Sequence, residues 1–340
     1  TVEEGTVVTF AKVPARTGYV NQGWSSKKNS EKATAKAKCT VNKNITLYAV
    51  QKKAVQLTFH RCDGSTWQKT TLAKGSSYSL PGVRDAEGYT FMGWSTKPMQ
   101  SVSPQYEAEE KITVNGNVDL YAVVFNRTTE TDLTEDQLPQ VDIYKYKQVI
   151  FVGDSRTEFM ENVLTGMGES ATKNVKFVCS AGKGLDWFTT TGWAQLYSIV
   201  QHDSNSILSK KTAVIFNFGV NDLSKSADYA EYYNWIAPQL KSKGCELYFM
   251  SVNPVNRLML PNAGRADRSE AAVRSFNQYM KANLSSAYTY IDMYSYLKST
   301  GYSFASDHYG TGTVDDGLHY TTRTYKRIFA KCMDSLRVPA

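Results

Sequence analysis

Residues Gln148–Phe159 read QVIFVGDSRTEF and decide the fold of the larger part of this 340-residue chain. The apolar run before Gly153 does not alternate with polar residues, so it predicts a strand that is buried on both faces of a sheet. Ser155 follows on a turn that enters a predicted helix. A hydroxyl there stands above the end of the strand, beside the backbone N–H groups and the positive dipole end of the helix. The stretch therefore predicts the first strand of an α/β sheet and a candidate nucleophile.

Further apolar runs alternate with longer amphipathic segments along the rest of the chain. The other predicted strands are VKFVCS (175–180), TAVIFNFG (212–219), ELYFMSV (246–252) and YTYID (288–292). The predicted helices are Trp187–Val200, Asp228–Lys243, Arg268–Leu284 and Thr322–Leu336. Unalternated strands separated by helices are typical of a parallel sheet covered on both faces. We expect a doubly wound, flavodoxin-like α/β domain with five parallel strands and a site at their carboxyl ends.

The second and third strands also end in residues that suit catalysis. Gly182 and Gly184 follow one strand, where glycine lets the backbone approach a ligand closely, and Asn221 follows the next. An amide side chain just past a buried strand can donate a hydrogen bond to an oxyanion. Each signal also has a plainer explanation, because serine caps helices and Gly and Asn are ordinary turn residues.

The residues before the last predicted helix offer a base for Ser155. Serine is a poor nucleophile near neutral pH, so it needs a base within hydrogen-bond reach and a carboxylate that fixes the tautomer of that base. Asp316 and His319 lie three residues apart in a turn, so the carboxylate can face the imidazole. His308, in the preceding Gly-rich loop, is the alternative base.

Three blocks, G-D-S, G-x-N-D and D-x-x-H, occur in an order and on elements that resemble the SGNH (GDSL-type) hydrolase family. The resemblance covers about 190 residues at the C-terminal end. It implies that Ser155 is the nucleophile, His319 the general base and Asp316 its orienting carboxylate. It also implies an oxyanion hole made by the N–H groups of Ser155 and Gly184 and the side chain of Asn221. The family's mechanism requires no metal or cofactor.

Two positions depart from the family pattern. Arg156 follows the serine, where Leu or Ile is common, and Cys179-Ser180 stands where the second block normally has Asn. We expect the Arg156 cation either to pair with Glu158 or Asp186 or to hold an anionic group of the substrate. The candidates for contact with the substrate are Asp154, Arg156 and Asp222.

The N-terminal part contains an internal repeat. GYVNQGWSS at Gly18–Ser26 recurs as GYTFMGWST at Gly88–Thr96, and LYAV at Leu47–Val50 recurs at Leu120–Val123. Repeated signatures in the same order indicate two copies of one module. They resemble the Listeria–Bacteroides repeat of bacterial surface proteins, also called the internalin B-repeat, which is a small β-grasp-like module without catalytic residues.

The second copy begins with an alternating strand, AVQLTFHRCDGS (Ala54–Ser65), that ends in the hairpin-turn dipeptide Asp63-Gly64. The first copy has no counterpart to this strand, so we expect the chain to begin inside a longer protein. The expected domains are a partial repeat at 1–53, a second repeat at 54–125, a linker and lead-in at 126–147, and the hydrolase domain at 148–340.

The net charge of +7 is confined to the N-terminal part, where residues 1–127 hold 17 Lys and Arg against 10 Asp and Glu; residues 128–340 hold 22 of each sign. A basic surface of this kind suits a cell-wall polymer, although a solvated face is the simpler explanation. No stretch is long enough to span a membrane, and no signal peptide opens the fragment. Five widely spaced cysteines suggest neither a disulfide framework nor a zinc site.

These features predict a secreted or cell-surface bacterial esterase. The leading substrate is a carbohydrate that carries O-acetyl or other short acyl groups, because the segment Tyr302–Gly312 near the site is aromatic and polar and no large apolar lid is present. A glycan O-acetyltransferase or a lipase would use the same residues. A wall-binding or adhesion protein with an inert hydrolase-like domain is the alternative that is not an enzyme. Neither a nucleic-acid partner nor a membrane span is expected.

Overall fold

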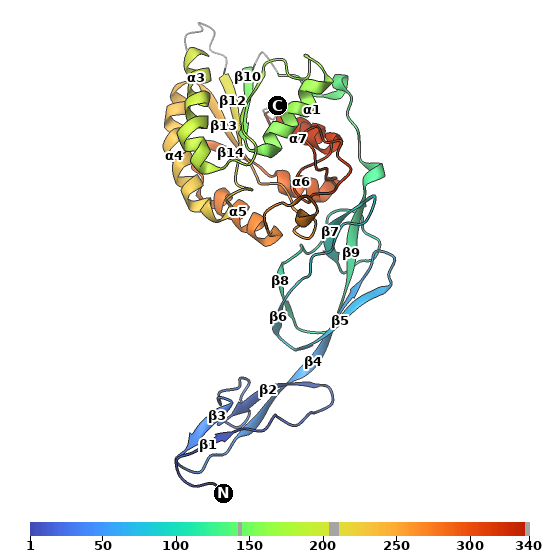
Figure 1. The fold of residues 1–340 in the computed structure, drawn as a ribbon, viewed down its shortest axis with the longest axis vertical. Helices are drawn as coiled ribbons and strands as arrows, with labels where there is room; N and C mark the ends of the chain where they lie inside the picture. Colours follow the sequence, from blue (N-terminus) through green and yellow to red (C-terminus); the bar gives the residue numbers. More distant parts are fainter. Residues whose placement is uncertain (142–144, 204–210, 337–340) are drawn as a thin grey trace. The chain divides into compact units, whose positions relative to one another are not determined.

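The computed structural model describes residues 1–141, 145–203 and 211–336 (Figure 1). Residues 142–144 of the expected lead-in, and 204–210 and 337–340 of the expected hydrolase domain, lie outside this description. The chain forms two compact units. The first, called the repeat unit below, comprises Thr1–Leu80, Ser95–Met99 and Glu110–Ala122. The second, called the α/β unit, comprises Pro81–Trp94, Gln100–Glu109 and Val123–Ala340.

The α/β unit is built on a five-stranded parallel sheet with the order β11-β10-β12-β13-β14. Its strands are β10 (Tyr146–Gly153), β11 (Val175–Cys179), β12 (Lys211–Asn217), β13 (Cys245–Met250) and β14 (Tyr288–Ile291). The chain winds outward in both directions from β10, which confirms the predicted flavodoxin-like α/β fold. The carboxyl ends of β11 and β12 flank the end of β10, because Gly153 is in register with Cys179 and with Asn217.

Alternate side chains of β10 enter two separate cores. Val149 and Phe151 pack into the core on one face, and Ile150 and Val152 pack into the core on the other. All four are at most 1 % exposed. Because neither face of the strand meets water, polar residues would be costly at every position, and this explains the unbroken apolar run.

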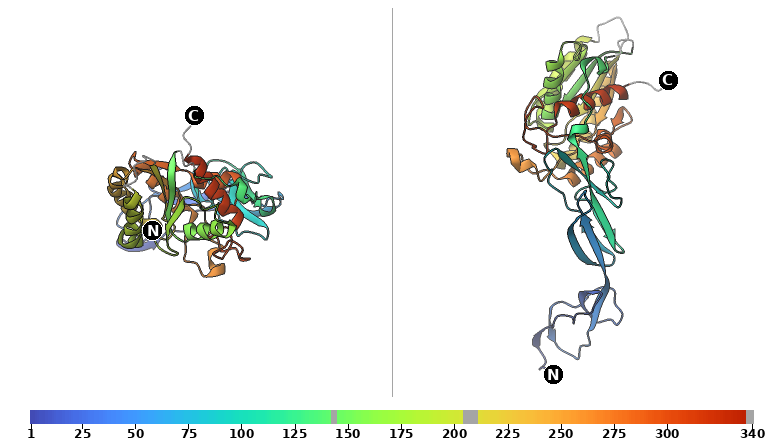
Figure 2. Two further views of the ribbon diagram at one scale, coloured as in Figure 1. Left: turned by 90° about the horizontal axis from the view of Figure 1, so that it is seen from above. Right: turned by 90° about the vertical axis from the view of Figure 1, so that its right-hand side faces the viewer.

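Helices cover both faces of the sheet (Figures 1 and 2). One face carries α1 (Ser155–Met167), α6 (Met293–Thr300) and α7 (Thr322–Ser335). The other face carries α3 (Trp193–Asp203), α4 (Ser226–Ser242) and α5 (Glu270–Asn283). The short α6 was not among the predicted helices, since eight residues give too little periodicity to recognise; its Leu297 is fully buried.

The predicted helix Trp187–Val200 is interrupted in the structure. Its residues form α2 (Leu185–Trp187), a π-helical turn η3 (Phe188–Gly192) and the start of α3. A Cβ on Gly192 would lie 2.7 Å from the side chain of Trp187 and 2.9 Å from that of Phe188. These two side chains therefore leave no space for a larger residue at this turn. The remaining short helical turns are η1 (Arg127–Thr129), η2 (Glu135–Gln137), η4 (Leu223–Lys225) and η5 (Leu260–Ala263).

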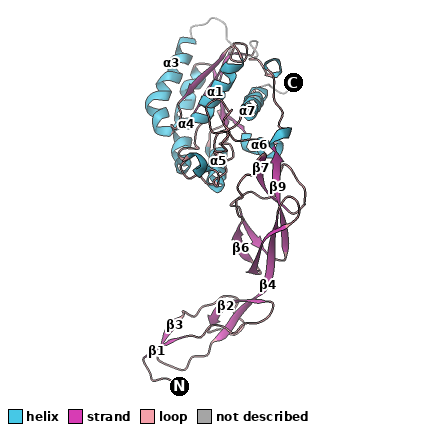
Figure 3. Ribbon diagram, turned by 45° about the vertical axis from the view of Figure 1, so that its right-hand side comes forward, coloured by secondary structure: helices cyan, strands magenta, loops and turns pink. Residues whose placement is uncertain are grey.

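The repeat unit consists mainly of β-structure (Figure 3). Its centre is β4 (Tyr48–His60), which joins the LYAV signature and the following alternating stretch into one strand. The first part of β4 pairs with β2 (Tyr19–Ser25) of the first copy, and the second part pairs with β5 (Thr66–Ala73) of the second. One strand therefore serves both copies. The shorter strands are β1 (Thr6–Thr9), β3 (Lys38–Val41), β6 (Ser76–Ser79) and β8 (Lys111–Val114).

Parts of the second repeat belong to the α/β unit. They come from the loop before β7 (Tyr89–Ser95), from β7 itself and from the end of β9 (Val118–Asn126). Met92 and Phe125 are buried in the same core as α6 and α7. Gly301 adopts a left-handed φ of +83°, and a Cβ there would lie 2.2 Å from the Phe125 ring, so glycine is required at this contact.

The segment expected to be a linker is packed rather than free. Leu138 and Val141 are buried in the core of the α/β unit. Glu130 is 5 % exposed and accepts hydrogen bonds from Arg327 and Thr324 of α7. The composition of this segment predicts a linker because it is mainly polar. Its few buried apolar residues are spaced singly and form no periodic pattern.

Two broader findings concern membranes and thiols. No helix of the described residues is long and apolar enough to cross a membrane.

All five cysteines are free; Cys245 and Cys332 are buried, whereas Cys179 is only half-buried. Burial raises the pKa of the Cys332 thiol well above its ordinary value, which keeps this group protonated.

Candidate active site

The candidate nucleophile Ser155 is the first residue of α1, directly after the central strand β10. Asp154 caps the helix by accepting a 3.0 Å hydrogen bond from the Arg156 N–H. Gly153 is needed at the turn, because a Cβ there would lie 1.9 Å from Thr157 Oγ1 and 2.8 Å from the Asn217 carbonyl oxygen. The tight strand-to-helix turn leaves Ser155 only 5 % exposed.

His319 and Asp316 complete a relay with this serine. The Nε2 atom of His319 lies 2.9 Å from Ser155 Oγ, and its Nδ1 atom lies 2.7 Å from Asp316 Oδ2. Because an ionised carboxylate only accepts, Nδ1 carries the proton and Nε2 is free to accept the serine proton. The other Asp316 oxygen accepts the backbone N–H groups of Leu318 and His319 at 2.9 and 2.8 Å.

The protonation states suit this relay. Burial raises the pKa of Asp316, but the hydrogen bonds from His319 outweigh it and hold the pKa below its ordinary value. Burial lowers the pKa of His319 below 6.5, against the opposing effect of Asp316. At neutral pH the carboxylate is therefore ionised and the imidazole is a neutral base.

The predicted oxyanion donors lie in the loops after β11 and β12. Asn221 donates from Nδ2 to the Lys183 carbonyl at 2.8 Å and accepts at Oδ1 from Arg268 Nη2 at 2.7 Å. The amide therefore ties the two loops together, and its second Nδ2 proton is available for a ligand. A Cβ on Gly184 would lie 2.3 Å from Asp222 Oδ2, so only glycine fits beside that carboxylate.

Two of the residues expected to contact the substrate have other partners. Asp222 accepts the Leu185 N–H at 2.9 Å and the Tyr229 hydroxyl at 2.8 Å, so it supports the loop that holds Gly184. Asp154 is 1 % exposed, and burial raises its pKa to about 6. Its Oδ2 has no hydrogen-bond partner among the residues that the structure describes.

The ion pair expected between Arg156 and Glu158 or Asp186 is not formed among the residues that the structure describes, and contact of Arg156 with a substrate anion stays a prediction. Its side chain is buried and donates to three backbone carbonyls, those of Leu318 at 3.0 Å and of Asn253 and Pro254 at 2.9 Å. The guanidinium also lies 5.2 Å above the Tyr320 ring. The cation turns inward beneath the His319 loop, where backbone carbonyls and not the carboxylates of Glu158 or Asp186 accept its hydrogen bonds.

The alternative base, His308, does not contact Ser155. Its ring packs on one side of Phe159 at 4.3 Å between centroids, and the His319 ring packs on Phe159 at the same distance. The side chain of His308 is 59 % exposed. Both imidazole rings therefore contact Phe159, but His319 and not His308 takes part in the relay.

Two arginines that the sequence did not suggest act on the site. Arg265 Nε lies 3.1 Å from Asp316 Oδ2, on the oxygen that also faces His319. Arg268 holds the Asn221 amide and also donates to the Val220 carbonyl at 2.7 Å. Both belong to the loop before α5, where the sequence GRADRS carries no signal of such contacts, because they depend on three loops meeting in space.

This arrangement defines a serine hydrolase of the α/β type. A family model described as GDSL-like Lipase/Acylhydrolase matches residues 149–332, and one for the Listeria-Bacteroides repeat domain matches residues 1–50 and 56–123. The first match covers more than half of the chain. The chain belongs to the GDSL-like lipase/acylhydrolase family, is a carboxylic ester hydrolase, and carries Listeria–Bacteroides repeats ahead of that domain.

Solved structures with low sequence identity resemble the chain. A protein from Bacteroides fragilis, described as an acylhydrolase, is 15 % identical with a TM-score of 0.38, covering 59 % of this chain and 92 % of its own. An acetyl xylan esterase is 11 % identical with a TM-score of 0.37, covering 56 % and 100 %. The esterase EstA from Pseudoalteromonas is 11 % identical with a TM-score of 0.34, covering 56 % and 96 %. No curated protein matches the chain.

Proposed function

We propose that the chain is a secreted bacterial serine esterase that removes O-acetyl or other short acyl groups from a carbohydrate. The observation that carries this proposal is the hydrogen-bonded relay from Ser155 through His319 to Asp316, with links of 2.9 and 2.7 Å. The relay joins a hydroxyl, a neutral imidazole and an ionised carboxylate, which are the groups that acyl transfer requires.

The reaction would proceed in two steps. Ser155 Oγ attacks the ester carbonyl while His319 Nε2 takes its proton, and the oxyanion is held by the N–H groups of Ser155 and Gly184 and by Asn221 Nδ2. The imidazolium then protonates the leaving alcohol, which leaves an acyl group on Ser155. In the second step His319 removes a proton from water, the hydroxide attacks the acyl carbon, and the acid leaves as Ser155 regains its proton.

The surroundings of the relay support a small acyl group on a polar substrate. Ser155 is only 5 % exposed, so little of the nucleophile is accessible, which favours a small acyl group. The loops around the relay carry exposed residues: Lys183, whose carbonyl accepts a hydrogen bond from Asn221, His308, whose ring packs on Phe159, and Tyr309, which is 65 % exposed. Aromatic faces beside polar groups suit sugar rings better than long acyl chains.

Release of acyl groups by the full chain tests the proposal. Chromogenic acetate, butyrate and octanoate esters should be hydrolysed with a preference for acetate, and acetylated polysaccharides should lose acetate. Substitution of Ser155 or His319 by alanine should remove both activities. Acetate release that requires a glycan acceptor would instead identify a transferase, and equal rates in wild type and variants would leave only a binding protein.

Secretion and contact with a wall polymer form part of the same proposal. The repeats are of a type found in bacterial surface proteins, and a hollow in the repeat unit is lined by Arg16, Lys52, Lys53 and Lys74 against one carboxylate, Glu31. A cationic hollow would hold a polyanion through contacts that salt weakens. Salt-dependent retention on purified anionic wall polymer, lost when the three lysines are changed to glutamine, would support this part; retention that ignores the lysines would refute it.

A further inference from the structure

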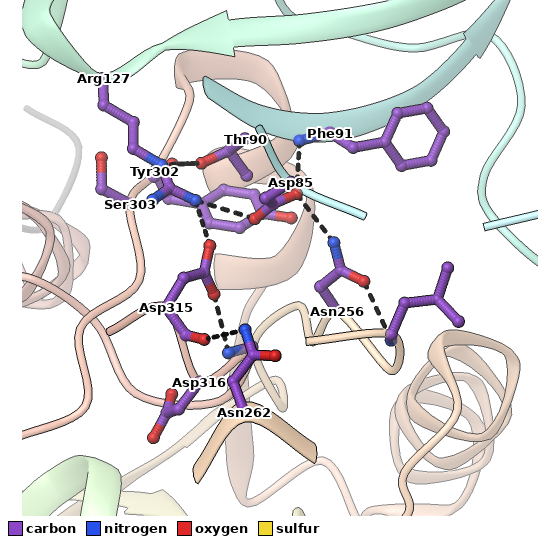
Figure 4. Close-up of polar contacts among 12 residues, drawn as sticks. Asp85, Thr90, Phe91, Arg127, Asn256, Asn262, Tyr302, Ser303, Asp315 and Asp316 are labelled. Carbon is purple, nitrogen blue, oxygen red and sulfur yellow. Dashed lines mark hydrogen bonds and ion pairs between the residues drawn. The ribbon is translucent and has the colours of Figure 1, made fainter. Parts of the chain in front are cut away.

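A buried ion network links the second repeat to the loop that carries the triad (Figure 4). At its centre is Arg127, which follows the last strand of the repeat. Its Nη2 lies 2.9 Å from Asp85 Oδ2 and also pairs with Asp315 Oδ2, while its Nε donates to Thr90 Oγ1 at 2.9 Å. Asp85 and Thr90 come from the second repeat, and Asp315 is the neighbour of Asp316 in the chain.

Asp315 fixes the turn that holds Asp316. Its Oδ1 accepts the Gly317 N–H at 2.9 Å, and its carbonyl accepts a 2.9 Å bond from Asn262 Nδ2. Gly317 has a left-handed φ of +63°, and a Cβ there would lie 2.3 Å from the Asn256 carbonyl oxygen. The turn is therefore closely packed, and Asp316 sits at its middle with a fully buried side chain.

Asp85 is also linked to the same turn through Asn256. Its Oδ1 accepts hydrogen bonds from Asn256 Nδ2 and from the Phe91 N–H, both at 2.8 Å. Asn256 in turn donates its backbone N–H to the Gly317 carbonyl at 2.8 Å. The carboxylate of the repeat therefore reaches both sides of the turn, through Arg127 to Asp315 and through Asn256 to Gly317.

The repeat also supports the other side of His319. Residues 303–305 pair with residues 319–321, since the Ala305 N–H donates to the His319 carbonyl at 2.9 Å and the Thr321 N–H donates to the Ser303 carbonyl at 3.0 Å. The preceding Tyr302 carbonyl accepts a 2.8 Å bond from Thr90 Oγ1, the hydroxyl that Arg127 contacts. The two segments that flank the imidazole thus meet at the Thr90–Arg127 pair.

The charges make this network sensitive to the loss of its cation. Arg127 stands between two carboxylates whose side chains are 1 % and 9 % exposed, those of Asp85 and Asp315. Burial, followed by the nearby Asp315, raises the pKa of Asp85 well above its ordinary value. Without the guanidinium, two buried carboxyl groups would face each other with no cation between them, and the turn would have to move.

We propose that Arg127 and Asp85 are positioning residues for the Asp316–His319 loop, so that the esterase is completed by the repeat that precedes it. This inference rests on the proposed function, since it assigns a role in the same relay. Neither residue touches the reacting atoms; both act through Asp315, Gly317 and the segment at Tyr302. The repeat would then be part of the catalytic apparatus and more than a spacer.

The test measures hydrolysis of a chromogenic acetate ester by the full chain. Arg127→Met should lower kcat roughly tenfold with KM changed by less than about twofold, because misplacement of a catalytic group acts on the chemical step. Arg127→Lys, which keeps the cation, should recover part of the loss. Glu87→Gln, an exposed acid of the same segment, is the matched control and should behave as wild type.

A double-variant cycle distinguishes positioning from general damage. If Arg127 acts through Asp316, Arg127→Met should change the residual activity of an Asp316→Asn background by less than about twofold. A loss of the same factor in both backgrounds would overturn the inference, as would a wild-type kcat in Arg127→Met. If Arg127→Met does not fold, Asp85→Asn, which keeps the shape and size of the side chain, replaces it in the test. An unchanged kcat in Asp85→Asn would also overturn the inference.

Failure of the proposed function gives a different result. A fluorophosphonate probe that labels wild type at Ser155 but labels Arg127→Met more slowly would agree with both proposals. A wild-type chain that neither hydrolyses esters nor reacts with the probe would refute the esterase itself. An active and reactive wild type with unaffected Arg127 and Asp85 variants would refute only the positioning role.

Discussion

The two copies of the repeat share a template but differ in what covers them. GYVNQGWSS of the first copy places Asn21 and Gln22 at exposed positions of β2. GYTFMGWST of the second copy places Phe91 and Met92 at the same positions of β7, where they are 7 % and 0 % exposed. The tryptophan follows the same trend, since Trp24 is only half-buried, whereas Trp94 is fully buried.

This difference places part of the second copy in the core of the α/β unit. Met92 lies in the core of the α/β unit, and the backbone carbonyl of the same residue accepts a 2.9 Å bond from Lys298 of α6. Phe91 and Met92 are neighbours in β7, so they bring apolar side chains to both faces of the strand, and burial is favoured by about 25 cal/mol for each Å² of apolar surface removed from water. The first copy keeps polar residues there and packs less of its strand.

Removal of the Ser155 hydroxyl tests whether the residues that react with the ester all lie in the α/β unit, and it should have the largest effect of the substitutions considered. Ser155→Ala should lower kcat for an acetate ester by about a thousandfold or more, because it removes the hydroxyl that lies 2.9 Å from the His319 imidazole. Steady-state rates of the full chain, with the folded state checked by circular dichroism, give the measurement. Residual activity of wild-type size would mean that the nucleophile lies elsewhere, in a repeat or in another loop.

A matched pair of substitutions tests the comparison of the repeats directly. Met92→Gln should destabilise the α/β unit by about 3 kcal/mol, because it removes a buried apolar side chain and buries an amide. Gln22→Met, at the equivalent exposed position, should change stability by less than about 0.5 kcal/mol. Denaturant unfolding, followed by circular dichroism and tryptophan fluorescence so that both units are observed, measures both. Equal effects would show that the two copies are packed alike.

Arg268 lies in the loop before α5 and supports Asn221, whereas Asp85 and Arg127 support the loop that holds Asp316. Arg268→Met should lower kcat about tenfold, because the Asn221 amide loses the partner that fixes its orientation towards the oxyanion. The effect should be smaller than the loss from Asn221→Ala. Arg257→Met is the control, since Arg257 pairs with Asp267 of the same loop and is 48 % exposed. A KM effect without a kcat effect would indicate a contact with substrate instead.

The smallest expected effect concerns pH. The charge of Arg265 lowers the pKa of His319, so removing it in Arg265→Gln should raise the pKa of the base. The acidic limb of kcat/KM should then move to higher pH, while rates above the limb change by less than about twofold. A pH–rate profile in buffers of constant ionic strength measures this. A limb that moves to lower pH would contradict the assignment of His319 as the base.

Much of the fold was predictable, because its signals are local or periodic. The unbroken apolar strands, the helices between them and the G-D-S turn all follow from backbone geometry and burial on two faces. The α/β class, the five-stranded parallel sheet and the family were confirmed in this way. Helix α6 and the π-helical turn η3 were missed, since eight residues and a local packing contact leave no repeating pattern.

The assignment of the triad residues came from the spacing of motifs, but their partners did not. The sequence placed Asp316 three residues before His319, and this spacing is short enough for one turn to determine their contact. Arg156 had two plausible partners along the chain, Glu158 and Asp186, and pairs with neither, because its position beneath the His319 loop depends on segments about a hundred or more residues away. Contacts over such distances carry no local signal.

Local sequence patterns were enough to predict a parallel α/β fold, a candidate nucleophile at the end of its central strand, a candidate base and its carboxylate in one turn, and two copies of a repeat. Only the tertiary structure decided that the second copy joins the core of the α/β unit, and that Asp85 and Arg127 meet the loop that holds Asp316. The physical reason is that hydrophobic patterns and turns act between neighbours in the chain. Buried ion pairs instead require charges from distant segments to meet, and this becomes known only when the chain is packed.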